Sequence, residues 1–192
     1  MRGRNNQRIE LESTIELLDQ FGRPFGELTA RQVESYSRAI GKFFMSFSYL
    51  ETSLDHMIIT AISERADERG YRVIKYLKFR DKIYYAKGEY SRMVSCIRNR
   101  RRKDGFYSRL ETICRRLIEI SEFRNKVAHA NWESLAVSGF VRVKIKDEQS
   151  GEGIQFVRVK MTPRVMNRFS RLAISVANDI DRFNDPSPLE YM

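Results

Sequence analysis

The stretch FYSRLETICRRLIEISEFRNKVA, residues 106–128, decides the fold class of this chain. Its apolar residues recur at steps of three and four, which is the spacing of one face of an amphipathic helix. They are Leu110, Ile113, Leu117, Ile120 and Val127, with Cys114 and Ile118 widening the same stripe. Such a helix must bury its apolar face, so the rest of the chain is expected to supply further helices.

Helical patterns lie on both sides of this stretch. Thr29 is expected to cap a long helix over about residues 30–65, in which Val33 to Ile62 recur at helical steps. A second helix starting within 71–78, and a helical face over 80–90, are expected to follow. Residues 98–105 lack apolar periodicity, and we expect a loop or a frayed helix end there. Residues 9–21 fit a short helix.

The periodicity changes to two after residue 140. Val141, Val143 and Ile145 alternate with charged residues, and so do Val157 and Val159 beyond a Gly-containing loop. Two alternating runs joined in this way predict a β-hairpin over 137–161. Thr162 and Pro163 then predict the start of a last helix. The expected fold is therefore mainly α, a helical bundle with an inserted hairpin. We expect a flank over 1–28, one domain over 29–185 and a tail over 186–192.

The composition limits the partners. The chain has 35 Lys and Arg against 25 Asp and Glu, a formal charge of +10, which favours an anionic partner such as RNA. Cys96 and Cys114 have no spacing typical of a disulfide or zinc framework, and we expect no metal and no cofactor. No apolar leader is visible at residues 1–11, and charges interrupt the apolar stretch 43–62. A cytoplasmic protein without a membrane partner is expected.

Chemistry is suggested by FRNKVAHANW, residues 123–132. Arg124 offers a fixed charge that suits a phosphate, and His129 exchanges a proton near neutral pH. Five residues turn a helix by about 140°, so these side chains converge only if His129 lies where the helix ends or if the site faces an interface. Asn125 is placed to orient either group. A structural pair at a helix end is the alternative.

Arg124 to His129 resembles the Arg-x4–6-His signature of HEPN domains, in the form with Asn directly after Arg. Ser48 to Asp55 is similar to the first long helix of that family. The resemblance implies a bundle that dimerises and brings two motifs into one cleft. It also implies a metal-independent endoribonuclease, in a toxin–antitoxin or phage-defence setting, with Arg124 and His129 catalytic and Asn125 accessory. Some members lack activity, so a non-catalytic RNA-, nucleotide- or protein-binding module is the alternative.

In one branch of the family, a tyrosine two residues after the histidine is modified by a partner. Asn131 stands at that position here, so this regulation is not carried over. Glu51 is expected either to pair with Arg124 or to be a solvated charge. Candidate RNA contacts lie in the basic run, next to the motif and on an expected shared face of the hairpin. They are Arg98, Arg100, Arg101, Arg102, Lys103, Lys126, Arg142, Lys144, Arg158 and Lys160, with Phe156 as a stacking residue. Solvated loop charges, or lysines that protect a strand edge, are the alternative for these cations.

Overall fold

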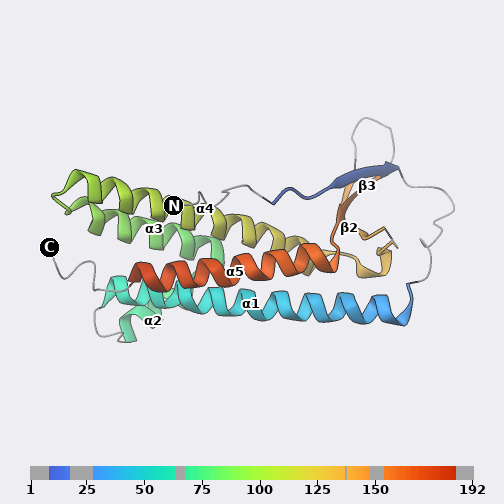
Figure 1. The fold of residues 1–192 in the computed structure, drawn as a ribbon, viewed down its shortest axis with the longest axis horizontal. Helices are drawn as coiled ribbons and strands as arrows, with labels where there is room; N and C mark the ends of the chain where they lie inside the picture. The colour runs from blue at the N-terminus through green and yellow to red at the C-terminus, as the bar shows by residue number, and fades with distance from the viewer. Residues whose placement is uncertain (1–8, 18–27, 64–67, 137, 148–153, 185–192) are drawn as a thin grey trace. The chain divides into compact units, whose positions relative to one another are not determined.

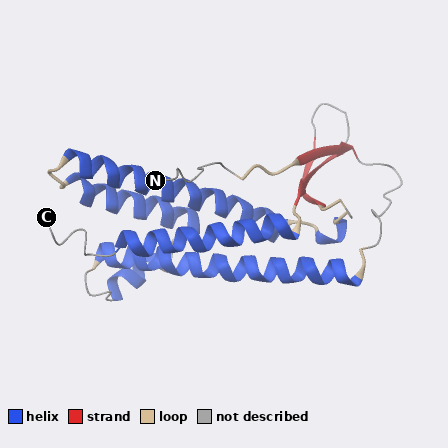
Figure 2. Cartoon of the chain, viewed as in Figure 1, coloured by secondary structure: helices blue, strands red, loops and turns tan. Residues whose placement is uncertain are grey.

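The computed structural model describes residues 9–17, 28–63, 68–136, 138–147 and 154–184 (Figure 1). Within these residues the chain is mainly helical with an antiparallel hairpin before the last helix, which confirms the predicted class (Figure 2). The chain divides into two compact units. The sheet unit holds residues up to Gly41 and Phe123–Asn167, and the helical unit holds Lys42–Glu122 and the residues from Arg168 on. The boundaries fall inside α1 (Ala30–Ile62), α4 (Arg100–His129) and α5 (Pro163–Asn184).

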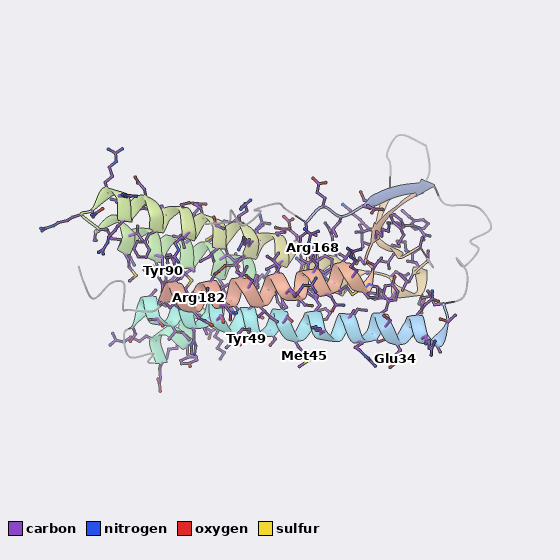
Figure 3. All side chains as sticks on the ribbon, viewed as in Figure 1. Glu34, Met45, Tyr49, Tyr90, Arg168 and Arg182 are labelled. Carbon is purple, nitrogen blue, oxygen red and sulfur yellow. The ribbon has the colours of Figure 1, made fainter. Side chains whose placement is uncertain are left out.

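The helical unit contains α2 (Glu68–Ile74), α3 (Phe79–Ser95) and the larger parts of α1, α4 and α5. Its core is formed by the apolar stripes that the periodicity predicts. A Cβ on Gly70 would lie 3.0 Å from the Cα of Ile59, so α2 lies close against α1. Tyr49 of α1 donates a hydrogen bond to Asp181 of α5 at 3.3 Å (Figure 3). Fully buried side chains include Phe43, Leu50, Leu54, Met57, Ile58, Ile59, Ile83, Leu110, Leu117, Ile120 and Phe169.

The predicted caps of α1 and α5 are confirmed. Thr29 Oγ1 accepts from the Gln32 amide at 3.3 Å, while Gln32 Oε1 accepts from the Thr29 amide at 2.8 Å. This reciprocal arrangement satisfies two amides that the helix start leaves without partners. Thr162 Oγ1 accepts from the Val165 amide at 3.3 Å, with Pro163 at the first helical position. Val33, which the periodicity places on the buried stripe of α1, is 49% exposed.

The basic run is helical from Arg100 on, so the prediction of a loop over 98–105 is wrong for most of that segment. Asn99 Oδ1 accepts from the Arg102 amide at 3.1 Å, which caps the start of α4. The first turns carry no apolar stripe because they bury little: Arg100, Arg101 and Arg102 are all exposed. Their helix is set by the cap and by the good helix propensity of arginine.

The sheet unit contains a three-stranded antiparallel sheet in the order β1 (Ser13–Leu17), β3 (Ile154–Lys160), β2 (Phe140–Asp147). The prediction of a helix over residues 9–21 is therefore wrong for β1, which pairs with β3 from Ser13 opposite Val159 onward. Residues 18–21 of that prediction, and the predicted tail, lie outside the described residues. A strand from the expected flank thus completes the sheet.

A β-bulge lies in β2 between Arg142 and Lys144. Before it, Arg142 stands opposite Arg158, so the two share a face of the sheet; after it, Lys144 stands opposite Val157. Because successive residues of β3 point to opposite faces, the bulge moves Lys144 to the other face. The expected common face of Arg142, Lys144, Arg158 and Lys160 is therefore wrong for Lys144.

Candidate functional site

The motif that resembles HEPN domains occupies the last turns of α4, in the sheet unit. Phe123 and Val127 are each 1% exposed and fix this end of the helix in the core. Asn125 and His129 are exposed, and Arg124 is half-buried. His129 is the last residue of α4, so a turn of about 140° still separates it from Arg124 along the helix, and convergence of the two side chains at the helix end or at an interface stays a prediction.

Asn125 contacts the motif arginine directly. Arg124 Nη1 donates to Asn125 Oδ1 at 3.2 Å. A hydrogen bond of this length restrains the guanidinium on the surface of α4. An orienting role for Asn125 towards Arg124 is thus geometrically feasible. Lys126, the next residue, is half-buried. The catalytic and RNA-binding assignments of these residues stay predictions.

Trp132, which follows His129, is fixed by a hydrogen bond and by a contact with an aromatic ring. Trp132 Nε1 donates to the carbonyl of Val127 at 3.1 Å, which satisfies one of the carbonyls that a helix end leaves open. The Trp132 ring also meets the ring of Tyr36, with 6.4 Å between the centroids. Burial raises the pKa of Tyr36. These contacts fix the end of α4 and, with it, the position of His129.

A hydrogen-bonded network joins this end to the sheet through η1 (Trp132–Ser134). The Asn131 amide donates to the Arg142 carbonyl at 2.8 Å. Ser134 Oγ accepts from the Arg142 amide at 2.8 Å and donates to the Asn131 carbonyl at 2.6 Å. Sequence reasoning missed Asn131, Trp132 and Ser134 as supports of the motif. The one available signal was the position of the chain's single tryptophan, three residues after His129.

The cations of the hairpin have partners of their own. Arg158 is 8% exposed and its Nη1 donates to the Ser134 carbonyl at 3.4 Å, so it supports η1. The Arg142 guanidinium lies 4.7 Å from the centroid of the Phe156 ring. Lys160 Nζ lies 2.8 Å from Glu12 Oε2. Lys144 is exposed. RNA contact by these residues stays a prediction, and Arg158 is the least accessible of them.

The basic run lies in the helical unit, at the turn between α3 and α4. Arg98, Arg100, Arg101 and Arg102 are exposed. Lys103 Nζ donates to the Ser95 carbonyl at 3.0 Å, where α3 ends. A cation is favourable at the C-terminal end of a helix, so Lys103 has a structural role. The four arginines remain the accessible part of the predicted RNA contact.

Glu51 is part of a partly buried charge cluster that the sequence did not reveal. Lys82 Nζ lies 3.1 Å from Glu51 Oε1, and 2.8 Å and 3.0 Å from the two carboxylate oxygens of Asp55. Burial raises the pKa of Asp55, although the hydrogen bond from Lys82 lowers it. Burial lowers the pKa of Lys82, but the hydrogen bonds to Asp55 and Glu51 together with their negative charges outweigh it, so the pKa is raised. Glu51 thus has Lys82 as a partner, and its pairing with Arg124 stays a prediction.

Two further findings concern the part of the chain that the structure describes. No group of three or more His, Cys, Asp or Glu side chains there is placed to hold a metal ion. None of the described helices combines the length and the hydropathy that a membrane crossing needs.

Comparison with known proteins gives no relative. No family model, no curated protein and no solved structure matches this chain.

Proposed function

We propose that the chain is a metal-independent endoribonuclease of the HEPN type that acts as a homodimer. The observation that carries the proposal is the position of the motif: α4 ends at His129, with His129 and Asn125 exposed and the helix end anchored by Trp132. A functional group held on a rigid element by supporting contacts meets the positional demand of catalysis. The formal charge of +10 suits a polyanionic substrate.

The proposed reaction uses the substrate's own nucleophile. A base removes the proton of a 2′-hydroxyl, whose oxygen attacks the adjacent phosphorus. The bond to the 5′-oxygen breaks, and an acid protonates that leaving oxygen, giving a 2′,3′-cyclic phosphate and a 5′-hydroxyl. His129 supplies the proton transfer because imidazole titrates near neutral pH. Arg124 stabilises the charge that develops on the phosphorane.

One imidazole cannot act as base and acid in the same step. A two-fold symmetric dimer solves this, because an isologous interface presents the same patch from both subunits. Each site would then receive Arg124 and His129 from both chains, with one imidazole taking the proton and the other giving one. The homodimer is part of the proposal for this chemical reason. A toxin or defence role, an antitoxin partner and a cytoplasmic location belong to the same proposal.

The test is cleavage of a mixed RNA by the purified full chain with chelator present. We expect His129→Ala to lower the cleavage rate about 10²- to 10⁴-fold, the range that general acid–base catalysis contributes. Arg124→Ala is expected to lower it similarly. His56→Ala is the matched control, since His56 is also an exposed histidine on a long helix but lies outside the motif. Mass spectrometry should find cyclic phosphate ends.

Two outcomes decide between the hypotheses. Cleavage at the full rate by folded His129→Ala protein would refute the assignment of the site. Wild-type protein that binds RNA without cutting it would instead support the non-catalytic binding module. Growth arrest on induced expression, relieved by His129→Ala, would support the toxin or defence role.

A further inference from the structure

Three exposed tyrosines lie in one short segment of the helical unit. The exposed fractions are 54% for Tyr71, 80% for Tyr76 and 52% for Tyr84. Tyr71 belongs to α2, Tyr76 to the turn after it and Tyr84 to the second turn of α3. Exposed aromatic rings carry a hydration cost, and their concentration in one segment indicates a surface that meets a ligand.

The segment is compact. The Lys75 amide donates to the Tyr71 carbonyl at 3.2 Å, and the Tyr76 amide donates to the Val73 carbonyl at 3.4 Å. These bonds close the turn directly after α2. From Tyr76 to the start of α3 the chain spans at most about 11 Å, and a further five helical residues rise about 7.5 Å to Tyr84. The tyrosines therefore lie within the length of a few nucleotides.

The rings of Tyr76 and Tyr84 each have a cation beside them. Lys75 Nζ lies 5.7 Å from the centroid of the Tyr76 ring. The Arg80 guanidinium lies 5.9 Å from the centroid of the Tyr84 ring, and Nη2 donates to the Tyr84 hydroxyl at 3.4 Å. A cation over one face of a ring leaves the opposite face to another planar group. The large exposed fractions show that these rings remain accessible with the cations in place.

The charges of the segment are mostly positive. Exposed cations outnumber exposed carboxylates five to two over residues 68–84, with Lys82 buried and not counted. Arg72 pairs with Glu68 at 3.1 Å, and the cations alternate with the tyrosines along the chain. This interleaving complements a ligand whose phosphates and planar bases alternate. The cations are Arg69, Arg72, Lys75, Lys78 and Arg80, and the carboxylates are Glu68 and Asp81.

We propose that this surface, called here the tyrosine platform, binds single-stranded nucleic acid. Tyr71, Tyr76 and Tyr84 would stack on bases, and the interleaved Lys and Arg side chains would contact the backbone phosphates. Aromatic stacking combined with backbone charge is how proteins hold single strands without reading their sequence. A duplex keeps its base faces stacked on one another, so it offers only its phosphates. The platform therefore favours unpaired strands.

The proposal does not rest on the nuclease. The platform lies in the helical unit and the Arg124–His129 motif in the sheet unit, so each can be tested without the other. Oligothymidylate lacks the 2′-hydroxyl that the proposed cleavage consumes, so it reports binding alone. A 2′-O-methyl oligouridylate gives the corresponding RNA-like probe.

The experiment measures fluorescence anisotropy of these two labelled single strands, and of a labelled DNA duplex of equal length, with the full wild-type chain. Single strands are expected to bind at least about tenfold more tightly than the duplex. The double variant Tyr71→Ala/Tyr76→Ala removes two stacking rings and should lose at least about 30-fold in affinity, which is twice the lower free-energy limit for one stacked aromatic residue. Tyr71→Phe/Tyr76→Phe keeps both rings and should stay within about twofold.

Two controls locate the effect. Tyr49→Ala removes a tyrosine that is 46% exposed but lies on α1, outside the platform, and should leave affinity unchanged (Figure 3). Arg100→Gln/Arg101→Gln removes charge from the first turn of α4, outside the platform. Equal binding of duplex and single strand, unchanged affinity of the Tyr71→Ala/Tyr76→Ala protein, or absence of binding at low salt would each overturn the proposal. Tyrosine-dependent binding without any RNA cleavage would uphold the platform and refute the nuclease.

Discussion

Removing the ammonium of Lys82 while keeping its carboxylate partners is expected to destabilise the helical unit. Lys82 is 9% exposed in its side chain, and its Nζ lies within 3.1 Å of both Glu51 and Asp55. Lys82→Met keeps much of the aliphatic stem but leaves two carboxylates one helical turn apart without their cation. Like charges at that spacing repel each other, and both are partly removed from water.

The magnitude follows from how far the partners are exposed. Breaking a fully buried ion pair by removing one member costs about 3–5 kcal/mol. Asp55 is 23% exposed and Glu51 is 38% exposed in their side chains, so water still solvates part of both carboxylates and the destabilisation is smaller. We expect a loss of about 2–3 kcal/mol in the free energy of unfolding at about pH 7. At about 2–4 °C per kcal/mol, the melting temperature should fall by about 4–12 °C.

The loss should depend on pH. Burial already raises the pKa of Asp55, and Lys82 opposes that rise. Without Lys82 the folded-state pKa of Asp55 moves further above its unfolded value, so the folded variant binds more protons than the unfolded chain. Its stability relative to the wild type therefore rises as the pH falls through that pKa. The difference between the two proteins is expected to be largest near pH 7 and smaller at acidic pH.

The assay is urea unfolding followed by circular dichroism at neutral and acidic pH. Lys87→Met is the matched control, because Lys87 forms a comparable ion pair with Glu111 at 2.7 Å in which both side chains are at least 40% exposed. It should cost less than about 1 kcal/mol. A Lys82→Met protein as stable as the wild type at neutral pH, or a loss that does not change with pH, would refute the reasoning.

Further predictions concern two glycines and the cysteines. Gly139→Ala should lower the melting temperature in thermal unfolding, because φ is +87° there and a Cβ would lie 2.7 Å from Thr162 Cγ2. Gly88→Ala, where nothing lies within 4 Å of the added Cβ, should instead raise the free energy of unfolding by up to about 1 kcal/mol. Burial raises the pKa of Cys114 to about 11, whereas Cys96 is exposed. Ellman's reagent at about pH 8 should therefore react rapidly with one thiol, and two fast thiols in the folded protein would contradict the burial of Cys114.

The helices were predictable because their signals are local. The stripe through Leu110, Leu117 and Ile120 is repeated within a few residues, and burial follows it. Thr29 and Thr162 act within one turn of their own helix starts. Periodicity and caps are properties of neighbouring residues, so they can be recognised in the sequence alone.

The two errors have different causes. Ser13–Leu17 becomes a strand because β3 offers it an edge, and within so few residues apolar spacing does not separate a strand from a short helix. The start of α4 lacks a stripe because Arg100 and Arg101 face solvent. A helix prediction based on apolar spacing cannot find an exposed first turn, and the Asn99 cap of this turn emerged only from the structure.

The candidate site was predictable only in its residue types. Arg124 and His129 were found from a short resemblance, but their supports come from the sheet, through Arg142 and Ser134. The bulge that moves Lys144 to the other face follows from backbone pairing and not from side-chain alternation. Tertiary partners of this kind leave no periodic signal in a single sequence.

The pairing of β1 with β3 also fixes an order of events during synthesis. Ser13 leaves the ribosome long before its partner Val159 has been translated, and at typical translation rates the wait is on the order of ten seconds. Through that interval the hydrogen-bonding groups of β1 have no native strand beside them. The hairpin of β2 and β3 can close soon after it emerges, since its strands are neighbours in sequence. The nascent chain therefore carries an open strand until β3 has emerged, which is the period when a chaperone would protect it best.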